Sequence, residues 1–349
     1  MQIVQARNVN DALATGIDYL LEHGVTEETR NGKCLVAPGP VCTVYAKPTE
    51  RVLFSPSRDA NPFFHLFESL WMLMGRDDVG FVANFAKRME TFSDDGRRMN
   101  GAYGYRWRQE FGFDQVKYLI AELKRNPKTR RAVMAMWKPE LDLLGEPLQR
   151  ELYRQKAEAG VRGGPNSKDL PCNTHVYFDV RGDKLNMTVC NRSNDIIWGC
   201  YGANAVHFSM LQEYMAALVG VPVGEYRQFS NNFHAYLDTY SVEKLKTIAA
   251  ECDTWNLYAN GEDVQPYPLV SRDENAWQHD LQAFTDDPAG SHAYRDPFFC
   301  DTVHPMYQAW AHRNNIHAAG TFIKQIKARD WKVAASAWLH KRAKKGEAA

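Results

Sequence analysis

The sequence predicts an α/β (α+β) fold in which helices flank one main, large mixed β-sheet. Residues 130–137 (RRAVMAMW) form a short apolar run typical of a buried strand. Residues 175–180 (HVYFDV) and 184–192 (KLNMTVCNR) are two β-prone runs joined by a turn-compatible RGD link, which predicts a hairpin. Other segments carry apolar residues at helical spacing, and this mixture indicates a sheet covered by helices.

The first helices are expected near the N-terminus. Residues 9–23 place Ala12, Ile17 and Leu20 on one helical face. Residues 62–75 (PFFHLFESLWMLMG) are too apolar for a surface helix, so this helix is expected to be buried.

Further elements follow along the chain. Residues 114–125 show helical spacing until NPKT interrupts it, and 203–219 form a long amphipathic helix that Gly220 closes. Residues 226–238 (YRQFSNNFHAYLD) are predicted to be a strand that leads into a helix.

Two regions look peripheral. Residues 138–170 are rich in charge, Gly and Pro, which predicts a surface insertion with one helix around 146–158. From about residue 300 the pattern is helical again, in the segments 305–313, 318–328 and 330–345. We therefore expect a main domain over 1–300, which contains the insertion, and a helical C-terminal extension over 301–349.

Composition narrows the function. The 349 residues contain 42 Lys+Arg and 42 Asp+Glu, so no general basic field recruits nucleic acid, and no direct nucleic-acid binding is expected. An anionic substrate must be held by locally clustered arginines. No apolar run approaches the roughly 20 residues that span a bilayer, and the first residues lack a signal-peptide pattern. The seven cysteines are odd in number and form no CxxC pair, which indicates free thiols in a reducing cytoplasm and no metal site.

Two neighbouring segments carry candidate chemistry. DLPCNTH (169–175) places Cys172 directly after a proline at the entrance to a strand, where a thiol meets a ligand more readily than inside a core. CNRSNDIIWG (190–199) follows the paired strand and offers Arg192, Ser193 and Asp195. The bland interpretation is a solvated ion pair. The functional one is an anion site whose arginine also favours the thiolate.

Two other segments are individually weaker. Arg130 and Arg131 precede an apolar strand; paired arginines usually lie on a solvated face but also suit phosphate binding. His234 and Tyr236 lie two residues apart and therefore on one face of a strand, where either alone is more often a core residue.

The order of these segments resembles the thymidylate synthase superfamily, and in character it is most similar to the phage deoxynucleotide (dUMP/dCMP) hydroxymethylases. The resemblance runs from about Arg30 to Tyr236 and is interrupted by the 138–170 insertion. Eight motifs carry it in the family's order: TRNG, FESLWML, NGAYGYRWR, TRRAVMAMW, LPCN, RSND, the asparagine before YMA, and HAY. The fold that this resemblance implies is the thymidylate-synthase-like one, with the catalytic domain over residues 1–300.

The resemblance also implies residue roles. The catalytic residues would be the nucleophile Cys172, the water-organising Glu68, the proton-removing Tyr103, and Asn204, which reads the pyrimidine edge. The substrate-binding residues would be Arg30, Arg130, Arg131, Arg192 and Ser193 on the phosphate, with His234 and Tyr236 on the sugar. Arg130 and Arg131 would reach the partner's nucleotide across a homodimer interface. Asp195, Trp71 and Gly199 would contact the co-substrate, 5,10-methylenetetrahydrofolate.

The implied reaction begins with addition of the thiolate to carbon 6 of the pyrimidine, which makes carbon 5 nucleophilic towards the folate's methylene group. After the folate leaves, hydride gives thymidylate, whereas water gives the 5-hydroxymethyl nucleotide. Three features favour water: Asn173 replaces the usual histidine after the nucleophile, RSNDIIWG is similar to the hydroxymethylase pattern, and AWLHKRAKKGEAA replaces a short apolar tail. We therefore predict 5-hydroxymethylation of dUMP in the cytoplasm, which is the host's cytoplasm if a phage encodes the protein, with thymidylate synthase as the alternative.

The choice of base depends on Asn204, whose amide complements uracil, whereas the cytosine-specific enzymes use aspartate. One extra residue lies between Gly199 and Asn204 relative to the family. If the gap falls elsewhere, Ala203 faces the base and a dCMP hydroxymethylase stays open. A non-catalytic nucleotide- or RNA-binding relative is a further alternative. A cysteine hydrolase is disfavoured because His175 is expected on the sheet face of Asn173.

Overall fold

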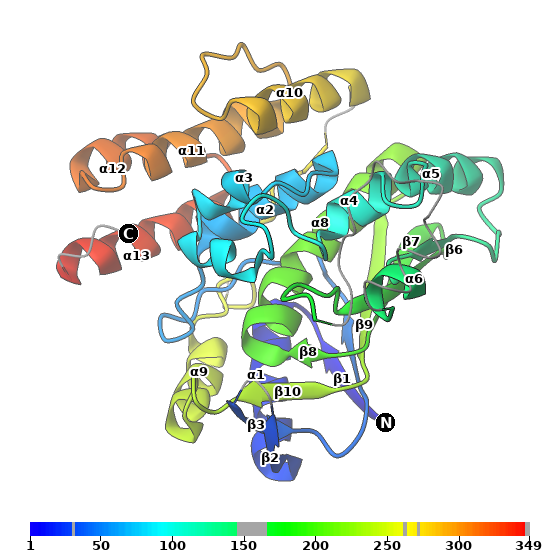
Figure 1. The fold of residues 1–349 in the computed structure, drawn as a ribbon. Helices are drawn as coiled ribbons and strands as arrows, with labels where there is room; N and C mark the ends of the chain where they lie inside the picture. Colours follow the sequence, from blue (N-terminus) through cyan, green and yellow to red (C-terminus); the bar gives the residue numbers. More distant parts are fainter. Residues whose placement is uncertain (30–31, 145–165, 261–263, 271–272, 346–349) are drawn as a thin grey trace.

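The computed structural model describes residues 1–29, 32–144, 166–260, 264–270 and 273–345 (Figure 1). A six-stranded mixed sheet forms its centre. In spatial order its strands are β1 (Gln2–Ala6), β4 (Val41–Tyr45), β9 (Val223–Ser230), β7 (Lys184–Asn191), β6 (Asn173–Arg181) and β5 (Val133–Ala135). The β1–β4 and β7–β9 pairs are parallel and the others antiparallel.

A second, four-stranded sheet adjoins the first. Its strands are β2 (Val25–Thr29), β3 (Gly32–Val36), β10 (Phe233–Tyr236) and β8 (Asn194–Asp195). The prediction of one main sheet was therefore incomplete, and the single strand expected within 226–238 was wrong. The β7–β9 pairing ends with Asn231, whose backbone N–H donates to Asn191 O. Asn232 donates to Arg192 O, and from Phe233 the chain pairs with β8 instead.

The two sheets separate along one crease. The chain leaves β7 and enters β8 across Arg192 and Ser193, and it leaves β9 and enters β10 across Asn231 and Asn232. The backbone N–H of Asn194 donates to Asn232 O at 2.8 Å, which ties the two connections together. The candidate site lies at this crease.

Buried helices cover one face of the large sheet. Helix α2 (Pro62–Met74) is buried at every residue except Met74, as its apolar sequence predicts, and begins at Asn61, whose side chain accepts from Phe64 N. Helix α8 (Asn204–Val219) packs against α2, β7 and β9 and ends at Gly220 in the left-handed conformation. The remaining elements on this part of the chain are α1 (Val9–His23), α3 (Val79–Ala83), the 3₁₀ helix η1 (Lys87–Phe92), α4 (Tyr103–Arg108), α5 (Gln115–Arg125), α6 (Pro139–Asp142) and α9 (Val242–Thr254).

The predicted hairpin is confirmed. Strands β6 and β7 pair antiparallel across Gly182 and Asp183, both with positive φ, which is the backbone that a two-residue turn of this hand requires. The helices expected at 9–23 and 114–125 are also confirmed. The helix expected around 146–158 lies outside the described residues.

The other face of the large sheet is uncovered by the described chain. One row of paired residues crosses the sheet on this face, and each is half-buried or exposed: Ile3, Cys42, Phe229, Cys190, His175 and Ala135. Residues that alternate with them along each strand, such as Val176 and Val189, are buried under the helices.

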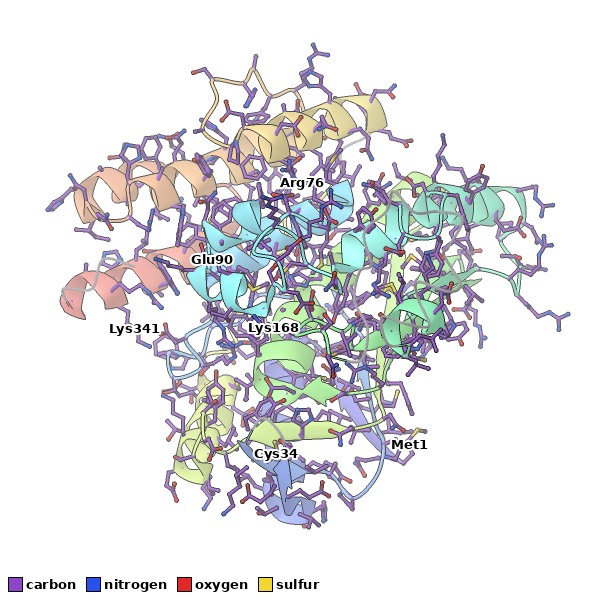
Figure 2. The ribbon with its side chains drawn as sticks, viewed as in Figure 1. Met1, Cys34, Arg76, Glu90, Lys168 and Lys341 are labelled. Carbon is purple, nitrogen blue, oxygen red and sulfur yellow. The ribbon has the colours of Figure 1, made fainter. Side chains whose placement is uncertain are left out.

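The C-terminal part is helical, as predicted. It contains α10 (Glu274–Asp286), the π-helical η3 (Phe299–Val303), α11 (His304–Ala311), α12 (Ile316–Gln325) and α13 (Arg329–Lys345). Figure 1 shows these helices gathered beside α2 and α3, opposite the small sheet. Phe63 of α2 contacts the rings of Trp310 and Trp338 at 5.4 and 5.5 Å, and Arg76 donates to Thr285 O at 2.6 Å (Figure 2). The division into residues 1–300 and 301–349 stays a prediction.

Candidate active site

Cys172 lies at the crease, immediately before β6. Its carbonyl accepts from the backbone N–H of Arg192 at 2.9 Å, so the strand entrance and the end of β7 are held together. The Arg192 guanidinium also donates to Pro171 O at 3.0 Å and to Leu170 O at 3.3 Å, and its cation lies 5.5 Å from the ring centre of Trp137. The predicted neighbours Cys172 and Arg192 are thus brought together.

Several influences act on the pKa of the Cys172 thiol in opposite directions. Burial raises the pKa of this half-buried thiol above its ordinary value, and the Arg192 charge is the largest influence that lowers it. Asp169 and Asp195 raise this pKa further, while a hydrogen bond with Tyr103 lowers it. The expectation that Arg192 favours the thiolate holds as a direction, but burial outweighs it in the unliganded site.

Tyr103 reaches this site from the first turn of α4. Burial raises the pKa of its phenol well above the ordinary value, with Cys172, Asp169 and Glu68 among the charges that raise it. Helix α4 is held against α2 by Gly104, since a Cβ there would lie 2.0 Å from Met72 O. Glu68 on α2 and Tyr103 on α4 therefore belong to one site.

Glu68 is 6% exposed and lies beside His207 of α8, with Oε2 and Nε2 2.9 Å apart. His207 was not predicted from the sequence. A histidine in the helix expected at 203–219 was the available signal, but its partner lies on a helix more than a hundred residues earlier in the chain.

Asp195 and His234 are paired across β8 and β10. The Asp195 carboxylate accepts from Trp198 N at 2.7 Å and Ile197 N at 3.3 Å, so it caps the following helical segment. Burial raises the pKa of Asp195 and lowers that of His234, while each partner's charge opposes the shift. His234 and Tyr236 lie on one strand face with ring centres 5.0 Å apart, and Ser193, two residues before Asp195 in the chain, is half-buried.

The extra residue between Gly199 and Asn204 is accommodated by a π-helix, η2 (Ile196–Ala203), with a kink at Gly202. A π-turn holds one residue more than an α-turn, so α8 starts at Asn204. Asn204 donates to Asn194 Oδ1 at 3.1 Å, and its Nδ2 would lie 3.6 Å from a Cβ on Gly199. Gly199 and Asn204 are therefore neighbours.

Arg58 and Asp169 are two further buried residues of this site that were not predicted from the sequence. Buried Arg58 donates from Nε and Nη2 to Ile197 O at 3.1 and 2.7 Å, which satisfies a carbonyl that the π-helix frees. Asp169 accepts from Gly101 N at 2.8 Å, and burial raises its pKa to about 6.

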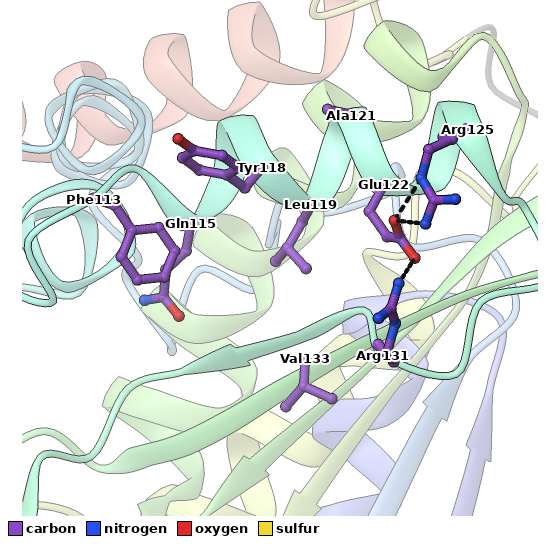
Figure 3. Close-up of a pocket in the computed structure, with 9 residues that line it drawn as sticks. All are labelled: Phe113, Gln115, Tyr118, Leu119, Ala121, Glu122, Arg125, Arg131 and Val133. Atoms are coloured by element: carbon purple, nitrogen blue, oxygen red, sulfur yellow. Dashed lines mark hydrogen bonds and ion pairs between the residues drawn. The ribbon is translucent and has the colours of Figure 1, made fainter.

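Arg130 and Arg131 lie apart from Cys172 in the same chain, and both are exposed. Arg131 donates to Glu122 at 3.1 Å at the rim of a surface pocket of about 470 Å³ beside β5 (Figure 3). Hydrogen bonds from Arg125, Thr129 and Arg131 lower the pKa of Glu122 to about 2. Arg30 lies outside the described residues.

A cavity of about 390 Å³ opens beside Trp198, next to Gly199 in sequence. Aromatic and basic side chains dominate its wall, and α13 supplies two of them. The wall consists of Arg58, Asp59, Asn61, Phe64, His65, Phe85, Ala86, Lys87, Arg88, Trp198, Trp310, Trp338 and Arg342. Trp71 is not part of this wall: it is 2% exposed and donates its indole N–H to Asp78, which gives it a packing role, and its folate contact stays a prediction.

The predicted direction of His175 was wrong. A register shift between Asn173 and His175 breaks the strand alternation, so Asn173 is buried and donates to Asn191 while His175 is exposed. His175 instead stacks on Tyr177 on the uncovered sheet face. In the described ranges, no helix is long and apolar enough to cross a bilayer, and no cluster of three or more His, Cys, Asp or Glu is placed to hold a metal ion.

The fold is that of thymidylate synthases. The structure superposes on the thermostable thymidylate synthase A from Bacillus subtilis with a TM-score of 0.53 at 20% identity, over 69% of this chain and 83% of that one. The thymidylate synthase family profile matches residues 17–254. This chain belongs to the thymidylate synthase family, which confirms the resemblance and the fold class predicted from the sequence.

Two similar phage proteins have the same name. The chain is 44% identical to the deoxyuridylate hydroxymethyltransferase of Pseudomonas phage M6 over 98% of its own length and 95% of that protein. It is 34% identical to the deoxyuridylate hydroxymethyltransferase of Bacillus phage SP01 over 69% of its length and 62% of that protein. The predicted similarity to phage deoxynucleotide hydroxymethylases agrees with both names.

Proposed function

We propose that this protein transfers a one-carbon unit from 5,10-methylenetetrahydrofolate to carbon 5 of dUMP and that water completes the reaction, giving 5-hydroxymethyl-dUMP. The observation that carries the proposal is the 44% identity, over nearly the whole chain, to a protein named deoxyuridylate hydroxymethyltransferase. The juxtaposition of Cys172, Arg192, Tyr103 and Glu68 supports it, because these groups supply a nucleophile, an anion site and two proton-handling groups.

Each side chain has a definite task. The Cys172 thiolate adds to carbon 6, and Arg192 favours that thiolate while it faces the nucleotide's phosphate. The enolate carbon 5 attacks the methylene group, and Tyr103 then relays the carbon 5 proton away. Tetrahydrofolate leaves unoxidised, and water adds to the exocyclic methylene before the thiolate departs.

Recognition of uracil rests on Asn204. One amide hydrogen is used by Asn194, which leaves the other hydrogen and the amide oxygen for the base. An N–H donor paired with an acceptor matches carbonyl 4 and N3–H of uracil, while cytosine presents the opposite pattern. The contacts of Asn204 support this assignment, because its amide lies beside Asn194 and Gly199 of the predicted site.

The folate fits the cavity beside Trp198. A pteridine and an aminobenzoyl group are flat and aromatic, and Phe64, Trp198 and Trp338 offer flat walls. The glutamate carboxylates of the folate need cations, which Lys87 and Arg88 supply at the same wall. Gly199 follows Trp198 in the chain and Asp195 accepts from Trp198 N, so these two of the three predicted folate contacts lie beside the cavity.

A homodimer completes the nucleotide site. The uncovered face of the large sheet is mostly of small or apolar residues, and Ile3 and Tyr177 on it are 50 and 43% exposed. Arg130 and Arg131 lie at the edge of this sheet, directly before β5. Packing two such faces together would bring these arginines to the partner's nucleotide phosphate, as proposed from the family resemblance.

The test is incubation of the protein with dUMP and ¹³C-methylene-labelled folate. We expect a nucleotide product heavier by one ¹³CH₂O unit, with tetrahydrofolate unoxidised at 340 nm. Thymidylate with dihydrofolate would identify a synthase, and product from dCMP alone would identify the cytidylate enzyme. Cys172→Ser should abolish product while Cys300→Ser, at an exposed thiol outside the site, should not. Activity that survives Cys172→Ser would refute covalent catalysis.

A further inference from the structure

His207 has no task in the scheme above, although it lies against the catalytic residue Glu68. Glu68 lies in the middle of α2, and His207 lies one turn after Asn204 on α8, so both face the space between two helices of the site. Their exposed fractions are 6% and 2%. Glu68 Oε2 and His207 Nε2 are 2.9 Å apart.

The pair is close but poorly satisfied. Glu68 Oε2 and both ring nitrogens of His207 form no hydrogen bond of acceptable geometry with any described residue. Buried polar atoms left unpaired cost about 1–3 kcal/mol each, so such a cluster needs a reason. Glu68 Oε2 and His207 Nε2, both unpaired and 2.9 Å apart, can together bind a small hydrogen-bonding molecule.

Titratable residues lie on both sides of the Glu68–His207 pair. His65 lies one turn before Glu68 on α2, and burial and the Arg58 charge hold the pKa of His65 well below its ordinary value, with a smaller contribution from His207. His65 is therefore a neutral neighbour. On the other side, Glu68 acts on the pKa values of Tyr103 and Asp169, both of which also interact with Cys172. Tyr103 and Asp169 therefore lie between Glu68 and Cys172 in this chain of interactions.

We propose that His207 is a positioning residue for the water step: its imidazole holds Glu68 so that the carboxylate binds and deprotonates the water that attacks the exocyclic methylene. The inference rests on the proposed function. Water oxygen forms a bond to the methylene carbon while the electron pair of that exocyclic double bond moves into the ring enolate. The water proton moves to Glu68. The enolate then re-forms the bond between carbons 5 and 6 and expels the Cys172 thiolate, and nothing is oxidised.

The experiment measures coupling rather than rate alone. With carbon-5-tritiated dUMP, each tritium released in the wild-type protein should correspond to one 5-hydroxymethyl product. In His207→Leu we expect product formation to fall about a hundredfold. Tritium release should exceed product, and added 2-mercaptoethanol should capture the stranded methylene as a thioether. A purely structural defect would lower both quantities together and leave their ratio at one.

Two companion variants sharpen the result. His207→Gln keeps an amide donor near Glu68 and should restore coupling. The side chain of His207→Asn is too short to reach Glu68, so this variant should remain uncoupled. It replaces His207→Leu in the test if the leucine variant does not fold. His279→Leu is the matched control, because His279 lies 3.0 Å from Asp280 on α10, outside the site. Its coupling should stay at one.

The outcomes separate the two claims. A wild-type protein that makes no 5-hydroxymethyl-dUMP overturns the proposed function. A wild type that makes it, with His207→Leu and His207→Asn fully coupled and yielding no thioether, overturns the role of His207 alone.

Discussion

At the scale of single residues, the Cys172 thiol lies among opposed charges. Burial raises its pKa, Arg192 lowers it, and Asp169 and Asp195 raise it again. A bound nucleotide changes this balance, because its phosphate competes for Arg192. The effect of the protein's own charges on the thiol pKa is therefore best measured without bound nucleotide.

The first residue-scale prediction concerns alkylation of Cys172 in the unliganded protein. Because burial raises the thiol pKa, its reaction with iodoacetamide should increase with pH up to a midpoint above that of an ordinary thiol. Arg192→Gln removes the positive charge and should move the midpoint higher. Asp169→Asn removes a nearby negative charge and should move it lower.

Peptide-resolved mass spectrometry checks these shifts, because the chain contains seven cysteines. The Arg192 and Asp169 variants have opposite expected signs, so a general loosening of the site would not reproduce both. A midpoint that stays unchanged in Arg192→Gln would show that this guanidinium does not act on the thiol.

Residues within short motifs were predictable from the sequence, whereas residues defined by contacts were not. Cys172, Arg192 and His234 lie in local patterns, and the structure brings them to one crease. Arg58 and His207 have no local pattern. Their roles follow from a carbonyl of a π-helix and a carboxylate on α2, and neither contact is specified by neighbours in sequence.

At the scale of elements, helix packing fixes the distance between catalytic groups. Helix α4 carries Tyr103 and approaches α2 closely enough that Gly104 has no room for a side chain. The buried Arg106 next to it donates to Met136 O and to both oxygens of Asp142, which anchors α4 to the end of β5. Contacts of α4 with α2 and with the end of β5 therefore position Tyr103.

Gly104→Ala tests this packing. Its Cβ would lie 2.0 Å from Met72 O and 2.4 Å from Met72 Cα, both backbone atoms, so α4 must move away from α2. We expect a loss of about 1–3 kcal/mol of stability, as for other overpacked cores. We also expect a larger fall in kcat than in nucleotide affinity, since Tyr103 moves with the helix.

Urea unfolding and steady-state kinetics measure the two effects. Gly80→Ala on α3 is the matched control, because nothing lies within 4 Å of a Cβ there and alanine favours a helix. That variant should be as stable as the wild type or slightly more so. An unchanged kcat in Gly104→Ala would show that the contact between α4 and α2 does not position Tyr103 for catalysis.

Helices with clear periodicity were predicted to within a residue or two, as α1, α2 and α5 illustrate. The division of the sheet between β9 and β10 was not predicted, because Asn231 and Asn232 carry no local signal for it and their partners, Asn191 and Arg192, lie far earlier in the chain. The only sign of the π-helix in the sequence was the one extra residue between Gly199 and Asn204 relative to the family. Both deviations lie at the site, where local patterns yield to long-range contacts.

At the scale of the whole molecule, the C-terminal helices lie beyond the family match at 17–254 but share the catalytic core. One contiguous hydrophobic cluster includes Phe63 of α2, Trp310 of α11 and Trp338 of α13. Ion pairs from Lys341 and Arg342 to Asp59 add a polar contact between α13 and the loop before α2 (Figure 2). Loss of α13 would uncover the helix that carries Glu68.

Trp338→Ala tests whether residues 301–349 behave as a separate domain or as part of one cooperative body. Trp338 is 5% exposed and contacts Phe63 and Trp310, so truncation should cost about 3–5 kcal/mol. Because the core is continuous, urea transitions followed by tryptophan fluorescence and by far-UV circular dichroism should coincide and shift together. Trp255→Ala, at a residue 44% exposed, should change stability by no more than about 0.5 kcal/mol. Two separate transitions, with only the first shifted by Trp338→Ala, would instead favour the division into residues 1–300 and 301–349 and would leave α2 stable without its C-terminal cover.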